Sequence, residues 1–131
     1  MNTPGSLRRL AVMGVLAWMI LIFALSSRST LPTTGGLPAN VAAIIGHLVA
    51  YAVLAALIRL AIRGFEPDFR ADLISVTLAT LYGLSDEFHQ SFVPGRDASV
   101  FDFLVDIAGA SLGVTITNLM GSFWRRPGRE S

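Results

Sequence analysis

Apolar residues occur in four long runs along the chain, and short polar segments separate them. The runs predict helices at about residues 10–27, 39–62, 71–91 and 98–120. A helix that crosses a bilayer needs about 20 predominantly apolar residues. The pattern therefore predicts an all-α, four-helix transmembrane bundle that forms a single domain over residues 1–131.

The segments between the runs carry residues that interrupt helices. Residues 26–38 are rich in Ser, Thr, Gly and Pro, and residues 93–96 read Val-Pro-Gly-Arg, which is a turn signal. Asp97 is the expected N-cap of the fourth helix, with Ser99 as the alternative.

Composition agrees with a membrane protein, because 53% of the residues are hydrophobic and only 15% are charged. The chain has no cysteine, which excludes a disulfide framework and a thiolate metal site. Its ten basic residues, all arginine, nearly balance nine acids. We therefore expect a lipid bilayer, and no nucleic acid, as the surroundings of this protein.

The first apolar run has two interpretations. Arg8 and Arg9 before it, and small residues at Ala24 and Ser26, are also typical of a cleaved signal peptide. The run is long for such a peptide and further spans follow it, so an uncleaved first helix is favoured.

The distribution of arginine predicts the orientation of the bundle. With a cytoplasmic amino terminus, four spans place eight arginines inside and only Arg28 and Arg96 outside. Such a bias is typical of cytoplasmic segments. We therefore predict that both termini are cytoplasmic and that the turn around Gly95 is external.

Polar side chains are concentrated in residues 81–113 of this otherwise apolar chain. An ionisable group inside a bilayer costs roughly 2.5 to 3.5 kcal/mol, so such groups pair with one another or line a wet cavity. A functional site is the default interpretation of this stretch. Its polar residues are Asp86, Glu87, His89, Gln90, Arg96, Asp97, Asp102 and Asp106.

The predicted topology brings polar groups from three helices to one depth. The third helix ends outside with Glu87, and Asp106 lies about two turns into the fourth. His47 lies roughly 12 Å below the outer end of the second helix, at 1.5 Å per residue, and Tyr51 follows one turn later. This convergence predicts a site that opens to the outer face.

Four segments of the chain also resemble the VanZ-like family of small bacterial membrane proteins. The most specific are YGLSDEFHQSFVPGR and DFLVDIAGASLG, supported by GHLVAYAVLAAL and FALSS upstream. The resemblance runs from about Leu21 to about Leu119 and implies a multi-pass protein of the bacterial cytoplasmic membrane. The founding member of the family is associated with low-level resistance to teicoplanin, without a settled reaction.

The resemblance implies a set of site residues, which the depth argument also singles out in part. We expect catalytic roles for His47, Glu87 and Asp106. Substrate binding is expected from Tyr51, Asp86, Gln90, Arg96 and Asp102. Many relatives carry a Lys and an acid just before the second-helix histidine, whereas residues 43–46 here are Ala-Ile-Ile-Gly.

Several of these residues also have structural interpretations. Arg96 could fold back to pair with Asp102, or could meet an anionic head group. Asp86 and His89 lie on another helical face from Glu87, so they could simply cap the helix end. Glu87 and Gln90 could hydrogen-bond across to the fourth helix instead of binding a ligand.

Five acids and two arginines lie on the predicted outer side, so a bare phosphate would be repelled. A lipid phosphate would need a bridging divalent cation, protonated carboxylates or charged histidines. Ligation of a metal by His, Glu and Asp is chemically reasonable, but their spacing matches no metal motif. The sequence therefore assigns no metal and no cofactor.

Three functional hypotheses remain open. The first is a cell-envelope protein that binds or modifies an envelope amphiphile or lipid-linked precursor at the outer leaflet. The others are a small oligomeric proton-coupled transporter and a non-catalytic membrane partner subunit. A transporter needs polar groups on both sides of the midplane, and the inner halves of the helices offer little beyond Ser75, Thr77 and Thr115.

Gly109 and Gly113 form a small-xxx-small pair on the stripe of Asp106. Such a pair lets another helix approach closely. The stripe is expected to pack a neighbouring helix, and it is a possible contact surface for a homo-oligomer.

Overall fold

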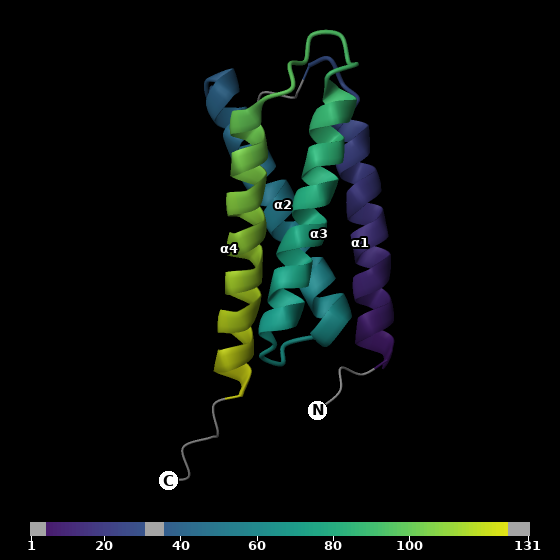
Figure 1. Ribbon diagram of the computed structural model, residues 1–131, viewed down its shortest axis with the longest axis vertical. Helices are drawn as coiled ribbons and strands as arrows, with labels where there is room; N and C mark the ends of the chain where they lie inside the picture. The colour runs from purple at the N-terminus through teal and green to yellow at the C-terminus, as the bar shows by residue number, and fades with distance from the viewer. Residues whose placement is uncertain (1–4, 31–35, 126–131) are drawn as a thin grey trace.

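The computed structural model describes residues 5–30 and 36–125, and this part of the chain contains four α-helices and no strand (Figure 1). The all-α, four-helix prediction is therefore confirmed. The helices are α1 (Gly5–Ser26), α2 (Ala39–Arg63), α3 (Phe69–Gln90) and α4 (Val100–Trp124).

The largest differences from the predicted bounds are the start of α1, at Gly5, and the end of α4, at Trp124. α1 begins at Gly5, so Arg8 and Arg9 lie inside it, because a charged residue ends the apolar run without ending the helix. The N-cap of α4 is Ser99, whose hydroxyl accepts the backbone N–H of Asp102 at 3.2 Å. The expected cap at Asp97 was therefore wrong.

α3 is the least apolar of the four helices. The other three are long and apolar enough to cross a membrane. α3 has 22 residues, as α1 does, and at 1.5 Å per residue it measures about 33 Å, enough for the hydrocarbon core of a bilayer. Several of its polar side chains are buried inside the bundle, among them Asp86, Glu87 and Gln90.

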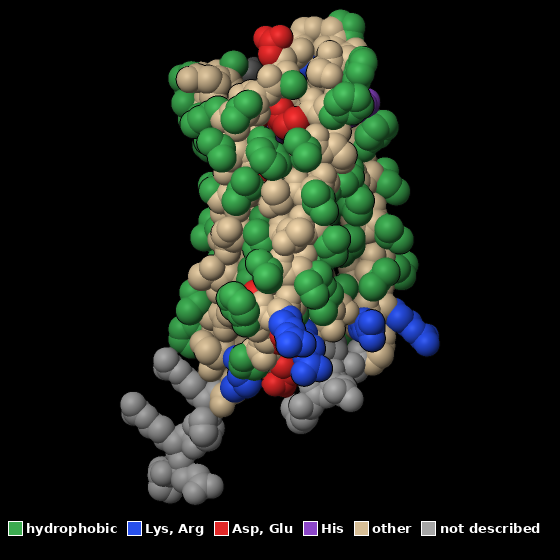
Figure 2. Space-filling view, in the orientation of Figure 1, with side chains coloured by type: hydrophobic (Ala, Val, Ile, Leu, Met, Phe, Trp, Pro, Cys, Tyr) green, Lys and Arg blue, Asp and Glu red, His purple; other side chains and the backbone are tan. Residues whose placement is uncertain are grey.

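The connections alternate between the two ends of the bundle. The α1–α2 and α3–α4 connections lie at the upper end in Figure 1, and the α2–α3 turn lies at the lower end with the start of α1 and the end of α4. On the visible face, arginine side chains gather at the lower end, and hydrophobic side chains predominate between the two ends (Figure 2). Which end faces the cytoplasm stays a prediction.

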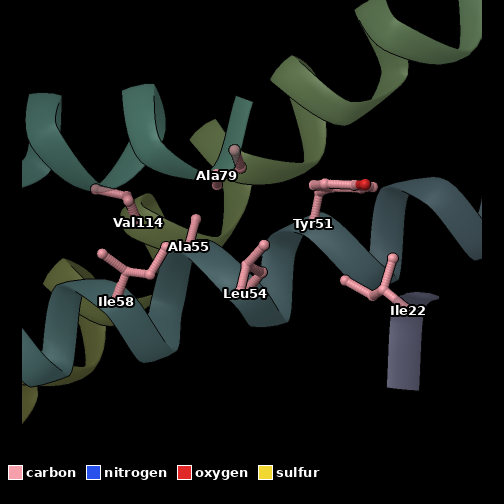
Figure 3. Packing of buried hydrophobic residues seen from close by; sticks show 8 residues of the cluster. Ile22, Tyr51, Leu54, Ala55, Ile58, Ala79 and Val114 are labelled. Atoms are coloured by element: carbon pink, nitrogen blue, oxygen red, sulfur yellow. The ribbon is translucent and has the colours of Figure 1, made fainter. Parts of the chain in front are cut away.

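α2 supplies half of the buried apolar core cluster, more than any other helix. Leu54 and Ala55 are fully buried, and Ala79 of α3 and Val114 of α4 pack against them (Figure 3). Small side chains at such contacts let helix backbones approach closely. The core cluster contains Ile22, Tyr51, Leu54, Ala55, Ile58, Ala79, Ala110 and Val114.

The glycine stripe of α4 lies directly against the backbone of α2. A Cβ atom added at Gly109 would lie 2.5 Å from the Leu48 carbonyl oxygen, and one at Gly113 would lie 2.0 Å from that of Ala52. The stripe thus packs helices, as expected. Because α2 of the same chain covers it, the suggested homo-oligomer contact through these glycines was wrong.

A buried polar group near the lower end was not expected. Arg59 is fully buried and its guanidinium donates to Asp72, while Asn118 donates to the same carboxylate at 2.9 Å. We call Arg59, Asp72 and Asn118 the lower cluster. The expectation of almost no polar groups in this half of the helices was therefore wrong.

Candidate functional site

Three ionisable side chains from three helices meet in the upper half of the bundle. His47 Nδ1 of α2 lies 2.8 Å from Asp106 Oδ1 of α4 and 3.9 Å from Glu87 Oε1 of α3. All three residues are buried, and one ligand atom from each lies within 4.8 Å of the others. We call His47, Glu87 and Asp106 the upper triad.

Glycine makes room for the carboxylate at the centre of this triad. A Cβ atom at Gly83 of α3 would lie 2.9 Å from Asp106 Oδ2 and 3.2 Å from the Tyr51 ring. Gly109, three residues after Asp106, brings α4 against α2 and so against His47. The helix contacts therefore place Asp106 in a fully buried position.

Glu87 is fixed by the start of α4. Its Oε2 accepts the backbone N–H of Ser99 at 2.8 Å, and Ser99 is also the N-cap of that helix. From the sequence, Ser99 was expected only as an alternative N-cap of the fourth helix. The contact shows that the α3–α4 connection also positions a site carboxylate, and helix spacing cannot reveal such a contact.

A second polar network lies beside the triad. Asp86 Oδ2 accepts the Ser26 hydroxyl at 2.9 Å and the Gln90 side-chain amide at 2.8 Å. Arg96 Nη2 donates to Gln90 Oε1 at 2.8 Å. Of the structural alternatives, the one in which Asp86 only caps the helix end and the one in which Arg96 pairs with Asp102 are therefore wrong.

The other predicted residues occupy more exposed positions. Asp102 is half-buried and close enough to act electrostatically on His47 and Glu87. His89 is half-buried, lies 3.0 Å from the Ser27 hydroxyl and stacks on the Phe23 ring. His89 therefore ties α3 to the end of α1 and does not join the triad.

Ser26 is a member of the network that the sequence analysis missed. It lies where the predicted first helix and first loop overlap, and the structure makes it the last residue of α1, 6% exposed. Its position could have indicated this role, because it is a hydroxyl at the end of an apolar run and lies at the depth of the buried carboxylates.

Three buried oxygen atoms of the site lack hydrogen-bond partners among the described residues. They are the Tyr51 hydroxyl oxygen, Glu87 Oε1 and Asp106 Oδ2. Tyr51 is 1% exposed and its ring stacks with that of His47. Most buried polar groups in native proteins are paired, so unpaired ones need an explanation.

A pocket of about 100 Å³ lies between α1, α2 and α3, and it reaches the triad through His47 and Tyr51 but is not lined by Glu87 or Asp106. Its polar wall is formed by the second network together with the imidazole of His47 and the phenol ring of Tyr51, both from α2. The polar lining residues are Ser26, His47, Tyr51, Asp86, Gln90 and Arg96.

An apolar groove of about 380 Å³ runs along α1 and α2 and shares lining residues with this pocket. Trp18 forms part of the groove, and its indole N–H donates to the Ala50 carbonyl at 2.8 Å, which holds the two helices together. The residues common to pocket and groove are Ile22, Leu25, Gly46 and Ala50.

The arrangement offers three chemical capacities. The triad can transfer a proton or ligate a cation through one imidazole and two carboxylates. The pocket can hydrogen-bond a small polar group, and the groove can hold a hydrocarbon chain.

Comparison with known proteins gives one family. Residues 10–121 match the family model described as VanZ/LLP1, which covers most of the chain. Comparisons with curated proteins and with solved structures gave no match.

Proposed function

Because the chain belongs to the VanZ/LLP1 family and three of its helices are long and apolar enough to cross a membrane, we propose that it binds an envelope amphiphile at the upper end of the bundle. The polar head occupies the pocket beside the triad, and the hydrocarbon chain lies in the groove between α1 and α2. The protein is a multi-pass membrane protein, and we place it in the bacterial cytoplasmic membrane.

The observation that carries this proposal is the shared wall of pocket and groove. Ile22 and Leu25 of α1 and Gly46 and Ala50 of α2 border both spaces. A ligand that fills both must be polar at one end and apolar along the rest. Lipids and lipid-linked precursors have this form, and the surrounding bilayer supplies them.

The triad and the pocket residues have separate parts in this proposal. The pocket residues Tyr51, Asp86, Gln90 and Arg96 hold the head group, and Asp102, which does not line the pocket, lies nearer the triad. His47 lies between Asp106 and Glu87, so it can exchange a proton with a bound head group while the carboxylates stabilise its charged form. The proposed function is therefore binding of the amphiphile. It includes modification of the amphiphile if the proton transfer from His47 serves a reaction.

The upper end is assigned to the outer face. Among described residues, Arg8, Arg9, Arg63, Arg70 and Arg125 belong to helix ends or the turn at the lower end, which supports a cytoplasmic lower end. Single cysteines at Ala98 and Ser122, both exposed, test this in the cysteine-free chain. An impermeant thiol reagent on intact cells should label the first and spare the second; the reverse pattern would invert the assignment.

The main test compares lipid content across variants. Protein purified in a mild detergent is released in a native mass spectrometer, and co-purified amphiphile is counted per chain for the parent and for Glu87→Gln, Asp106→Asn and His47→Asn. We expect at least a tenfold loss of a specific adduct. Asp97→Asn, which removes an exposed acid near the same end, should keep it.

Growth under teicoplanin, at matched membrane levels of each variant, tests the predicted link to glycopeptide response. We expect the parent and Asp97→Asn to protect and the three triad variants to fail. Full protection by all triad variants, or equal adducts on every protein, would refute the proposed site.

A further inference from the structure

We propose that the upper triad of His47, Glu87 and Asp106 holds a divalent metal ion. The proposal rests on the proposed function, because the ion would lie beside the same pocket and would meet the head group there. It assigns a ligand to a cluster whose sequence spacing matches no metal motif.

The geometry of the triad is close to that of a three-ligand site. An ion with tetrahedral ligands at about 2.1 Å separates those ligand atoms by about 3.4 Å. His47 Nδ1 lies 2.8 Å from the Asp106 oxygen and 3.9 Å from the Glu87 oxygen. These separations bracket the required value, so small side-chain rotations would complete the coordination.

The unpaired oxygens give a second and independent indication. Glu87 and Asp106 are 5% and 0% exposed, yet Glu87 Oε1 and Asp106 Oδ2 have no hydrogen-bond partner. Two buried carboxylates this close to one imidazole are costly unless a cation compensates them. An ion ligated by Glu87 Oε1, His47 Nδ1 and the Asp106 carboxylate would satisfy the unpaired Glu87 oxygen and balance both carboxylate charges.

The second contact of Glu87 resembles the support that metal ligands need. Carboxylate ligands are usually hydrogen-bonded through an outer partner that fixes their orientation. Glu87 Oε2 accepts the Ser99 N–H at 2.8 Å, which leaves Oε1 directed toward His47. The α4 N-cap thus holds the carboxylate ready for ligation.

The donor set indicates the class of ion and of ligand. One imidazole with two carboxylates suits Zn²⁺ or Mn²⁺ better than soft or purely oxygen-bound ions. Three protein ligands leave coordination positions open. An ion there would cancel the acidic charge of the triad, so a head group bearing phosphate becomes acceptable to a site that would otherwise repel it.

Metal content is the direct test. The parent is stripped with a chelator, dialysed, and titrated with Zn²⁺ and with Mn²⁺, with bound metal measured by mass spectrometry and free Mn²⁺ by electron paramagnetic resonance. We expect one saturable equivalent. Glu87→Gln and Asp106→Asn should weaken binding at least tenfold, while Asp97→Asn should match the parent.

Substitution with Co²⁺ keeps the test decisive if a variant folds poorly. The parent alone should then show visible absorption bands of a coordinated ion, and Zn²⁺ should displace them. Absence of saturable binding in the parent, or equal affinity in the folded Glu87→Gln protein, would overturn the ion site.

A lipid experiment separates this proposal from the broader one. Nanodiscs of phosphatidylcholine, with or without phosphatidic acid, are offered to the parent with metal or with EDTA, and inorganic phosphate is offered alone. Retention of phosphatidic acid that EDTA abolishes supports both proposals, and binding of inorganic phosphate alone identifies the phosphate group as the recognised part. Retention that EDTA leaves unchanged refutes the ion but keeps amphiphile binding. Metal binding without any lipid enrichment keeps the ion site but refutes amphiphile binding.

Discussion

The two polar clusters of the bundle both contain buried ionisable side chains, but they differ in how completely their hydrogen-bonding atoms are paired. In the lower cluster, Arg59 donates to Asp72, to the Asn118 side chain and to the carbonyls of Gly64 and Glu66. In the upper triad, two carboxylate oxygens remain unpaired and a pocket adjoins. A saturated cluster is sufficient as architecture, whereas unpaired oxygens beside a pocket support the proposed ligand.

An apolar layer separates the clusters. His47 and Arg59 lie about 18 Å apart along α2 at 1.5 Å per residue. Leu54 and Ala55, both fully buried, lie between them, and Ala79 and Val114 pack against them from α3 and α4. This apolar layer between the clusters weighs against the transporter hypothesis, even though the lower half is more polar than the sequence indicated.

The largest expected effect is the loss of the lower cluster. Arg59→Met keeps an unbranched side chain but removes the cation, so Asp72 keeps only the Asn118 donor, and the Asn118 side-chain oxygen and two carbonyls lose the arginine. Removing one partner of a buried ion pair costs about 3 to 5 kcal/mol. Because the Asp72 side chain is 22% exposed, we expect a loss near the lower limit, measured by thermal unfolding in detergent.

Arg63→Met is the matched control, since this arginine lies one turn later on α2 and its side chain is 54% exposed. It should change stability by less than about 1 kcal/mol. If both variants unfold at the same temperature, the lower cluster is not what stabilises that end of the bundle.

The next effect tests the α2–α4 contact on which both clusters depend. Gly113→Ala would ordinarily raise helix propensity by about 1 kcal/mol. Here the new Cβ would lie 2.0 Å from the Ala52 carbonyl oxygen, so we expect a net destabilisation of about 1 to 3 kcal/mol. Gly5→Ala, with nothing within 4 Å of the added atom, should be neutral or slightly stabilising; the same sign for both would contradict the close contact.

Much of the fold follows from the sequence because the bilayer restricts the possible structures. Apolar runs of spanning length gave four helices in the correct order, with α2 predicted at 39–62 and found at Ala39–Arg63. Counting 1.5 Å per residue also placed His47, Glu87 and Asp106 at one depth, and the structure brings them together.

The lower cluster shows what this reasoning misses. An arginine at a helix end is a normal feature of the membrane interface, so Arg59 was read as a topology signal. Its burial depends on the turn from Gly64 to Asp68, which folds α3 back so that Asp72 and the Glu66 carbonyl meet the guanidinium. Side-chain pairing of this kind depends on helix rotation and turn geometry, which hydrophobic periodicity does not determine.

A third prediction concerns the upper site and has the opposite sign. Tyr51→Phe removes a buried hydroxyl that has no hydrogen-bond partner while it keeps the ring that packs in the core. An unpaired buried polar group costs about 1 to 3 kcal/mol, so the variant should gain roughly 1 kcal/mol in stability without ligand. Amphiphile retention should fall in the same protein.

This combination of higher stability and weaker binding identifies a group reserved for a ligand. A Tyr51→Phe protein that loses stability in the unliganded state would show that the hydroxyl already has a partner inside the protein. The lower cluster offers the matched contrast, because there every expected change in stability is a loss.

The smallest effect lies at the exposed N-cap of α3. The backbone N–H groups of Ala71 and Arg70 and the nearby Arg63 guanidinium lower the pKa of Asp68. A carboxyl whose folded pKa is depressed contributes stability above its unfolded pKa, about 3.9, and loses it as the pH falls through the folded value.

Asp68→Asn retains a good cap but no charge, so the parent should be slightly more stable at pH 7. Unfolding temperatures measured in parallel from pH 7 to pH 2.5 should show this gap closing below about pH 4, and a gap that stays constant across the range would assign the stabilisation to something other than the charge of Asp68.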